Sequence, residues 1–125
     1  MINRKFWWLL GLMFLAGSLN GTMDTIDFQW DRSVFKDIQN EDIRKWFKSE
    51  ASDKFKEWHG IKLHPIFWDG WHFFKQIMVI VFILGLAFVD WEVPLNIKNI
   101  LIYFFAFGVA WWAGFTLLYN ILLVY

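Results

Sequence analysis

The chain has 125 residues, of which 58% are hydrophobic and 22% aromatic. One soluble core of this size cannot bury so much aromatic surface, so the composition favours a membrane protein. Lys and Arg together number 12 and so do Asp and Glu, which leaves no basic surplus that would indicate a nucleic-acid partner. The absence of cysteine excludes disulfides, thiolate catalysis and cysteine-based metal sites.

The first predicted element is an apolar stretch over residues 6–23, preceded by Arg4 and Lys5. A basic start followed by an apolar run is typical of a secretory signal peptide or of a retained signal anchor. We interpret this stretch as a retained first span, with the cleaved signal peptide as the alternative, because it is long enough for a tilted crossing. Gly17 and Gly21 form a single GxxxG pattern, which permits close helix contact or simply loosens the helix near its exit.

A connecting region of mixed charge follows over residues 24–70, and its middle part predicts an amphipathic helix over residues 41–59. Asn40 is a suitable N-cap and Gly60 a suitable C-cap for this helix. An aromatic-rich apolar face suits a helix that lies in the membrane interface, although it could also pack over the spans or on a partner. The face has helical spacing and consists of Ile43, Trp46, Phe47, Ala51, Phe55 and Trp58.

The second predicted span covers residues 71–89. Three ionisable side chains lie just before it or in its first turns, Asp69, His72 and Lys75. Asp69 is a good helix N-cap, and its spacing from His72 places the two close to one face. Ionisable groups at membrane depth are costly and tend to be functional. These three are therefore the candidate catalytic residues: His72 as a general base, Asp69 as its orienting carboxylate (a role that Asp24 could also fill) and Lys75 as an anion binder. The alternative is a structural role, in which Lys75 either extends to the headgroups or turns inward to pair with Asp24 or Asp69.

All three histidines lie within residues 59–72, and this clustering makes the region a candidate divalent transition-metal site. Imidazole and carboxylate groups bind such metals when three or four of them converge. The histidine spacing matches no established zinc pattern, and histidine also occurs at membrane interfaces for structural reasons. The candidate metal ligands are His64, Asp69, His72 and Asp24.

The third predicted span covers residues 97–124 and follows a short loop at residues 90–94. Three small residues, Ala106, Ala110 and Gly114, recur every fourth position along it. Such a ridge lets another helix approach closely. We therefore expect self-association, or association with another membrane protein, through this ridge.

These elements predict an all-α fold, in which residues 1–125 form a single integral membrane domain with three transmembrane helices and one interfacial helix. Three spans place the two termini on opposite sides of the bilayer. The short basic N-terminus favours a cytoplasmic location for that end. The eight Lys and Arg residues of the connecting region, against three on the other side, argue for the opposite orientation.

A set of residues after the first span and at the start of the second resembles a group of small uncharacterised bacterial multi-pass membrane proteins. The resemblance covers about a third of the chain, and residues 46–58 depart from it. It implies a membrane fold and highlights Asp24 together with the three candidate catalytic residues, but it implies no reaction. The matching residues are Met23-Asp24, Phe28, Ser33-Val34-Phe35 and Asp69-x-Trp71-His72-x-x-Lys75.

Three functions fit these patterns. The first is a non-enzymatic accessory or assembly subunit of a membrane complex, which the small-residue ridge and the aromatic surface favour. The second is a membrane-interface enzyme, with or without a bound metal, that acts on a lipid or a lipid-linked substrate. The third is a holin-like or channel-forming oligomer. Against it, the third span has no polar stripe beyond Thr116, Tyr119 and Asn120 that could line a pore.

Overall fold

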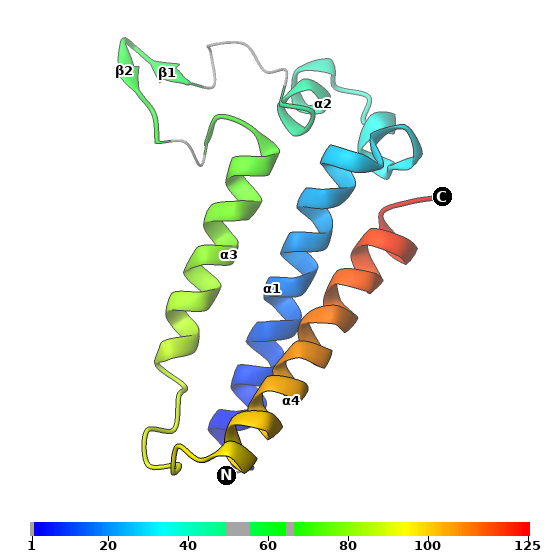
Figure 1. Cartoon of the computed structure of the whole chain (residues 1–125). Coiled ribbons are helices and arrows are strands. Elements are labelled where there is room, and N and C mark those ends of the chain that lie inside the picture. Colours follow the sequence, from blue (N-terminus) through cyan, green and yellow to red (C-terminus); the bar gives the residue numbers. More distant parts are fainter. Residues whose placement is uncertain (1, 50–55, 65–66) are drawn as a thin grey trace.

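The computed structural model describes residues 2–49, 56–64 and 67–125. The described residues between the first two long helices (residues 29–49, 56–64 and 67–69) lie over one end of the bundle and are called the connecting segment, and the two termini lie at opposite ends (Figure 1). The predicted dominance of helix is confirmed. The main elements are three long helices that run side by side, α1 (Arg4–Phe28), α3 (Gly70–Leu86) and α4 (Ile97–Thr116).

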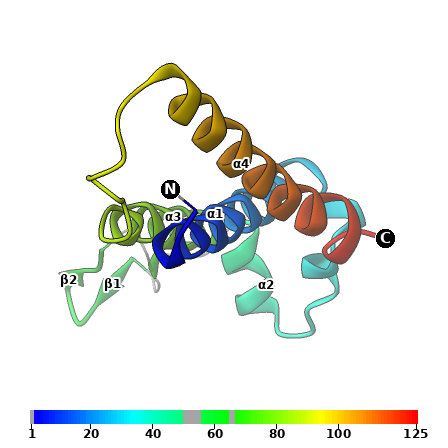
Figure 2. The same ribbon diagram turned by 90° about the horizontal axis from the view of Figure 1, so that it is seen from below.

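Helix α1 is the central helix, because it packs against both α3 and α4 (Figure 2). Glycines allow the close approach of α1 to α4. A Cβ atom added at Gly17 would lie 2.0 Å from the carbonyl oxygen of Trp111, and one at Gly114 would lie 2.1 Å from the carbonyl oxygen of Phe14. A Cβ atom at Gly21 would lie 2.7 Å from the backbone of α4. The GxxxG pattern and the last residue of the small-residue ridge therefore both lie in the contact between α1 and α4 within one chain.

Hydroxyl groups on α1 are satisfied within the helix. Ser18, Thr22 and Thr25 each donate a hydrogen bond to the carbonyl oxygen four residues earlier, at 2.8–2.9 Å. Thr25 is fully buried and Thr22 nearly so. This local pairing lets α1 place polar residues on its packed face without leaving a buried hydroxyl unpaired.

Three aromatic rings join the connecting segment to α3. Helix α2 (Glu41–Phe47) lies over the first turn of α3, where a Cβ atom at Gly70 would come within 2.9 Å of the Phe47 ring. The Phe47 ring centroid lies 4.8 Å from that of Phe35, which is buried, and 6.2 Å from that of Phe74. This small apolar cluster fixes the position of α2 above the bundle.

The far end of α4 is also attached to the connecting segment. Helix α4 continues as a π-helical stretch (Leu117–Leu122), after which the chain pairs with the 3₁₀ turns that follow α1. The backbone N–H of Val34 donates to the carbonyl oxygen of Leu123 at 2.9 Å, and that of Tyr125 donates to the carbonyl oxygen of Arg32 at 3.0 Å. The connecting segment therefore contacts both α3 and the end of the α4 chain.

The predicted helix over residues 41–59 is correct only as far as Phe47. Residues 50–55 lie outside the described part of the chain, and a β-hairpin follows, with strands β1 (Glu57–Trp58) and β2 (Ile61–Lys62). His59 and Gly60 form its two-residue turn, with φ of 49° and 79°. Positive φ at both positions is the requirement of a type I′ hairpin turn. Gly60 was predicted as a helix C-cap because that position also favours a left-handed residue, so the same preference serves a different motif.

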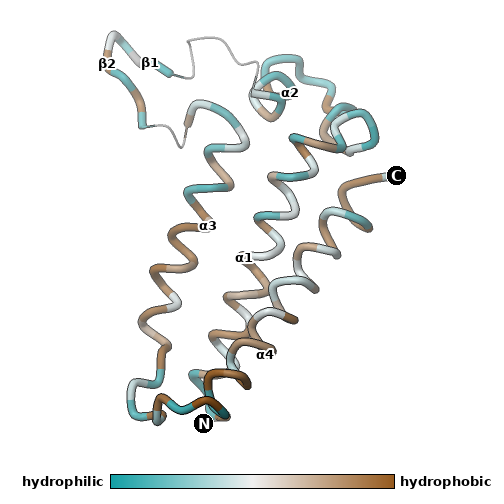
Figure 3. Tube along the Cα trace, in the orientation of Figure 1, coloured by the Kyte–Doolittle hydropathy of each residue, from teal (hydrophilic) through white to brown (hydrophobic). Residues whose placement is uncertain are grey.

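The three predicted spans differ in length from the observed helices. Within the described part of the chain, two helices are long and apolar enough to cross a membrane, Arg4–Phe28 and Ile97–Leu122, whereas the apolar helix Gly70–Leu86 has 17 residues and is shorter. The prediction extended α3 to residue 89 because the sequence stays apolar there. In the structure, residues 87–89 instead form a tight turn in which each N–H bonds the carbonyl three residues back. Figure 3 shows the hydrophobic residues along the helices and the hydrophilic ones concentrated towards both ends.

At the end of the bundle that lies away from the connecting segment, side-chain hydrogen bonds join the start of α1 to the loop between α3 and α4. Asn3 caps α1 by accepting from the backbone N–H of Phe6 at 3.1 Å, and its amide donates to the Asp90 carboxylate at 2.8 Å. This hydrogen bond, together with one from the backbone N–H of Glu92, lowers the pKa of Asp90 below its ordinary value of 3.8. The start of α1 is thereby tied to the loop between α3 and α4.

Candidate functional site

Asp69 and His72 form a hydrogen-bonded pair at the start of α3. One Asp69 carboxylate oxygen accepts from the backbone N–H of His72 at 2.8 Å, as expected of an N-cap. The other oxygen lies 2.8 Å from Nδ1 of the His72 ring. The carboxylate is largely buried and the imidazole is partly exposed, with side-chain exposures of 14% and 37%. The predicted contact between these two residues is confirmed.

In this geometry the Asp69 carboxylate can orient the His72 ring, as a carboxylate does for a histidine that acts as a general base. A carboxylate on Nδ1 favours the tautomer that carries its proton there, which leaves Nε2 free to accept a proton. The arrangement supplies an oriented base, while the three-residue spacing on one helix also explains the contact as a simple capping interaction. The pair is therefore chemically able to act but does not by itself identify a reaction.

Lys75 does not join this pair. Its ammonium group lies 4.7 Å from the centroid of the Trp71 ring, in a cation–π contact, and the side chain is exposed. Among the described residues, no ion pair connects Lys75 with Asp24 or Asp69, the two partners considered for it. The Trp71 side chain also hydrogen-bonds Asp27, which links the end of α1 to the start of α3.

The four candidate metal ligands are not brought together. Within residues 2–49, 56–64 and 67–125, no group of three or more His, Asp or Glu side chains is arranged to hold a metal ion. Asp69 and His72 are adjacent, Asp24 lies on α1, and His64 lies after β2, where its carbonyl oxygen accepts from the backbone N–H of Phe67 at 3.0 Å. The metal site stays a prediction, and of its four residues the structure pairs two.

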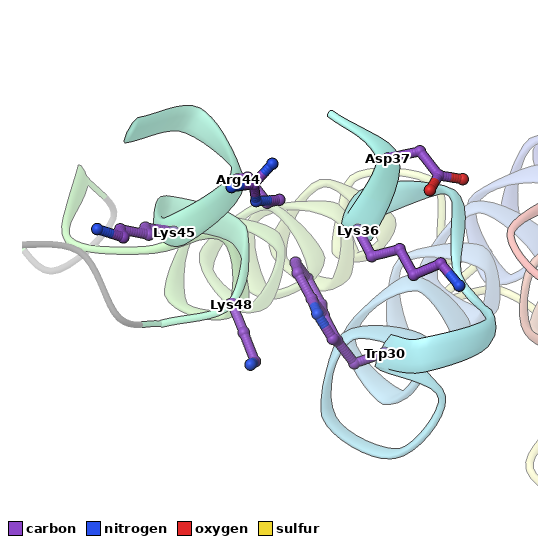
Figure 4. A pocket seen from close by; sticks show the side chains of 6 residues that line it. All are labelled: Trp30, Lys36, Asp37, Arg44, Lys45 and Lys48. Carbon is purple, nitrogen blue, oxygen red and sulfur yellow. The ribbon is translucent and has the colours of Figure 1, made fainter. Parts of the chain in front are cut away.

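A basic pocket in the connecting segment was not predicted as a site. Its volume is about 410 Å³, and it lies between the turns after α1 and helix α2 (Figure 4). No sequence pattern predicts a role for the basic residues of α2 or for those of the turns after α1. The spacing of Arg44 and Lys48 shows that they share a helix face, but only the fold brings Trp30 beside them. The lining residues are Trp30, Lys36, Asp37, Arg44, Lys45 and Lys48.

Several contacts fix the positions of these side chains. Arg44 Nη1 donates to the carbonyl oxygen of Ile38 at 3.1 Å, and the Lys48 ammonium lies 5.7 Å from the centroid of the Trp30 ring. Lys45 forms an ion pair with Glu41 at 2.7 Å, and this hydrogen bond lowers the pKa of the Glu41 carboxyl. The pocket wall is therefore partly ordered by the protein itself.

A second pocket lies at the opposite end of α1, with a volume of about 640 Å³. Two basic and two acidic side chains line it, so its charges balance. The lining residues are Asn3, Arg4, Lys5, Asp90, Trp91 and Glu92.

Comparison with protein-family models, with curated proteins and with solved structures gives no match to this chain. The resemblance to small bacterial membrane proteins, drawn from the residues around Asp24 and Asp69, therefore stays a prediction.

Proposed function

We propose that the chain is a small integral membrane protein without catalytic activity, which acts as an accessory or assembly subunit of a membrane complex. The observation that carries this proposal is the exposure of α4. In the most apolar stretch of the helix Ile97–Leu122, which contains α4, 11% of the residues are buried in the bundle. In the most apolar stretch of α1, 39% of the residues are buried. The core helix of a water-soluble protein would be mostly covered, so α4 requires an apolar environment outside the chain.

The outward face of α4 carries large aromatic side chains. Phe104, Phe105 and Trp112 are 63–70% exposed. Gly114 of the small-residue ridge is packed against α1, so the whole ridge is not available to a partner. We therefore assign the proposed association to the aromatic face of α4. Aromatic residues make large contacts at low entropic cost, which suits a helix–helix interface within the bilayer.

The proposal includes three spans in a bacterial inner membrane with a cytoplasmic N-terminus. Helix α3 has 17 residues and is therefore about 26 Å long, close to a hydrocarbon core of about 30 Å. The apolar turn that follows it to residue 89 extends this length. Exposed aliphatic side chains along α3, such as Ile83 and Leu86, support its contact with lipid.

A photocrosslinking amino acid placed at Phe105 or Trp112 in native membranes tests the association. We expect one discrete adduct, containing either a second copy of this chain or one other membrane protein, identified by mass spectrometry. Val81 on α3 is 4% exposed, so the same substitution there is the matched control and should give no intermolecular adduct. Adducts with lipid alone at both α4 positions, together with a monomeric mass in native nanodiscs, would contradict the accessory function.

A second candidate function is a membrane-interface enzyme acting on a lipid or a lipid-linked substrate, favoured by the oriented Asp69–His72 pair. In that case His72 is the base, and its replacement by alanine abolishes turnover while the fold persists. In an accessory subunit, the same replacement affects only local stability.

A further inference from the structure

The basic pocket differs from the pocket at the other end of α1 in its charge balance. Four cationic side chains and one carboxylate line the basic pocket, against two of each sign at the opposite end. The single carboxylate, Asp37, already accepts a hydrogen bond from the Tyr125 hydroxyl at 2.5 Å. The basic pocket therefore presents a net positive charge to whatever enters it.

Two of its cations are arranged on one helix face beside an aromatic wall. Arg44 and Lys48 are four residues apart on consecutive turns at the end of α2, and Figure 4 shows the Trp30 ring standing between Lys48 and Lys36. The bond from Arg44 to a backbone carbonyl orients its guanidinium, which keeps further N–H donors. A guanidinium and ammonium groups around one cavity match the oxygen atoms of a phosphate.

The pocket lies immediately beyond the end of an apolar helix. Trp30 follows α1 by two residues, and Phe28, the last residue of α1, is 74% exposed. Trp side chains concentrate at the level of lipid headgroups, because their rings are apolar and their N–H groups are polar. A pocket at this level would meet the phosphate groups of lipids rather than their acyl chains.

We propose that this pocket binds the phosphate of an anionic phospholipid headgroup, with Arg44 and Lys48 as its main ligands. Trp30 forms the wall on which the glycerol part of the headgroup rests. The inference depends on the proposed insertion into a bilayer, but not on the proposed association with a partner protein.

Native mass spectrometry of the purified chain, released from mild detergent with added lipid, tests this site. Phosphatidylglycerol should bind in preference to phosphatidylcholine, which carries no net charge. The double variant Arg44→Gln/Lys48→Gln should weaken phosphatidylglycerol binding by about ten- to thirtyfold, since each basic residue near a charged lipid surface contributes to the attraction. The single variant Lys48→Gln, which keeps the Arg44 anchor, should show an intermediate loss.

The matched control is Arg4→Gln/Lys5→Gln, which removes the same charge at the balanced pocket and should leave phosphatidylglycerol binding within about twofold of the wild type. Equal losses in the two double variants, or unchanged binding in the Arg44→Gln/Lys48→Gln protein, would overturn the site.

Competition with glycerol phosphate distinguishes a lipid headgroup from a free phosphate compound as the ligand. Displacement of the lipid only at a large excess of glycerol phosphate supports the lipid headgroup. Binding of glycerol phosphate as tight as that of the lipid would overturn the lipid assignment. Each outcome is independent of whether the photocrosslinking experiment finds a partner.

Discussion

At the scale of single residues, Asp69 has two roles that use different oxygen atoms. One oxygen caps α3 through the backbone N–H of His72, and the other contacts the ring of the same residue. The capping role could be predicted from the sequence, because an aspartate directly before an apolar helical run is a recognised start signal. The absence of a contact between Lys75 and Asp69 could not be predicted, because the spacing alone does not decide between a carboxylate and the neighbouring Trp71 ring.

Substitutions at Asp69 separate these roles. Asp69→Ala removes both contacts and should lower the free energy of unfolding by about 1–2 kcal/mol. Asp69→Asn keeps an oxygen for the cap and should behave like His72→Ala, because each loses mainly the ring contact. Thermal unfolding of the three variants in mild detergent, followed by circular dichroism, gives the comparison. If Asp69→Ala were no less stable than Asp69→Asn, the capping oxygen would contribute nothing.

At the scale of elements, glycine spacing gave useful but incomplete information. The pattern at Gly17 and Gly21 indicated a close helix contact, but the partner helix could come only from the fold, since the contacted residues of α4 lie more than ninety positions away. The predicted amphipathic helix was wrong at residues 57–59 for a related reason. Apolar spacing does not distinguish a continuing helix from a short hairpin when each strand has two residues.

The close contact between α1 and α4 predicts opposite effects for one substitution at two positions of α1. Gly17→Ala places a Cβ atom against the backbone of α4, so the helices must separate, at a cost of about 1–3 kcal/mol. Gly11→Ala is the matched control, because nothing lies within 4 Å of the added atom there, and it should stabilise the helix by about 0.5–1 kcal/mol. Denaturant titration of both variants in detergent provides the measurement. Equal changes in stability would mean that α4 does not approach α1 at Gly17.

At the scale of the whole molecule, the sequence predicted the order of the long helices and their apolar character, which the structure confirms. The central position of α1 was not predictable, because it depends on contacts between distant parts of the chain. The same holds for the pairing of Val34 with Leu123, which joins the end of α4 to the connecting segment. The basic pocket depends on this arrangement, and so it was missed although its cations are visible in the sequence.

The central claim is that the helices cross a bilayer, and α3, the shortest of them, is its most demanding case. The chain contains no cysteine, so single cysteines can be introduced at exposed positions before and after α3. Gln39→Cys lies in the connecting segment and Glu92→Cys in the loop between α3 and α4. The unmodified chain is the control and takes up no label.

The most direct measurement is labelling of these two variants with a membrane-impermeant maleimide in intact spheroplasts and after permeabilisation. With α3 across the membrane and the N-terminus in the cytoplasm, Gln39→Cys should label in intact spheroplasts and Glu92→Cys only after permeabilisation. The reverse pattern would keep the crossing and invert the orientation. Equal labelling of both positions in intact spheroplasts would contradict the account, because it would place both ends of α3 on the same side of the membrane.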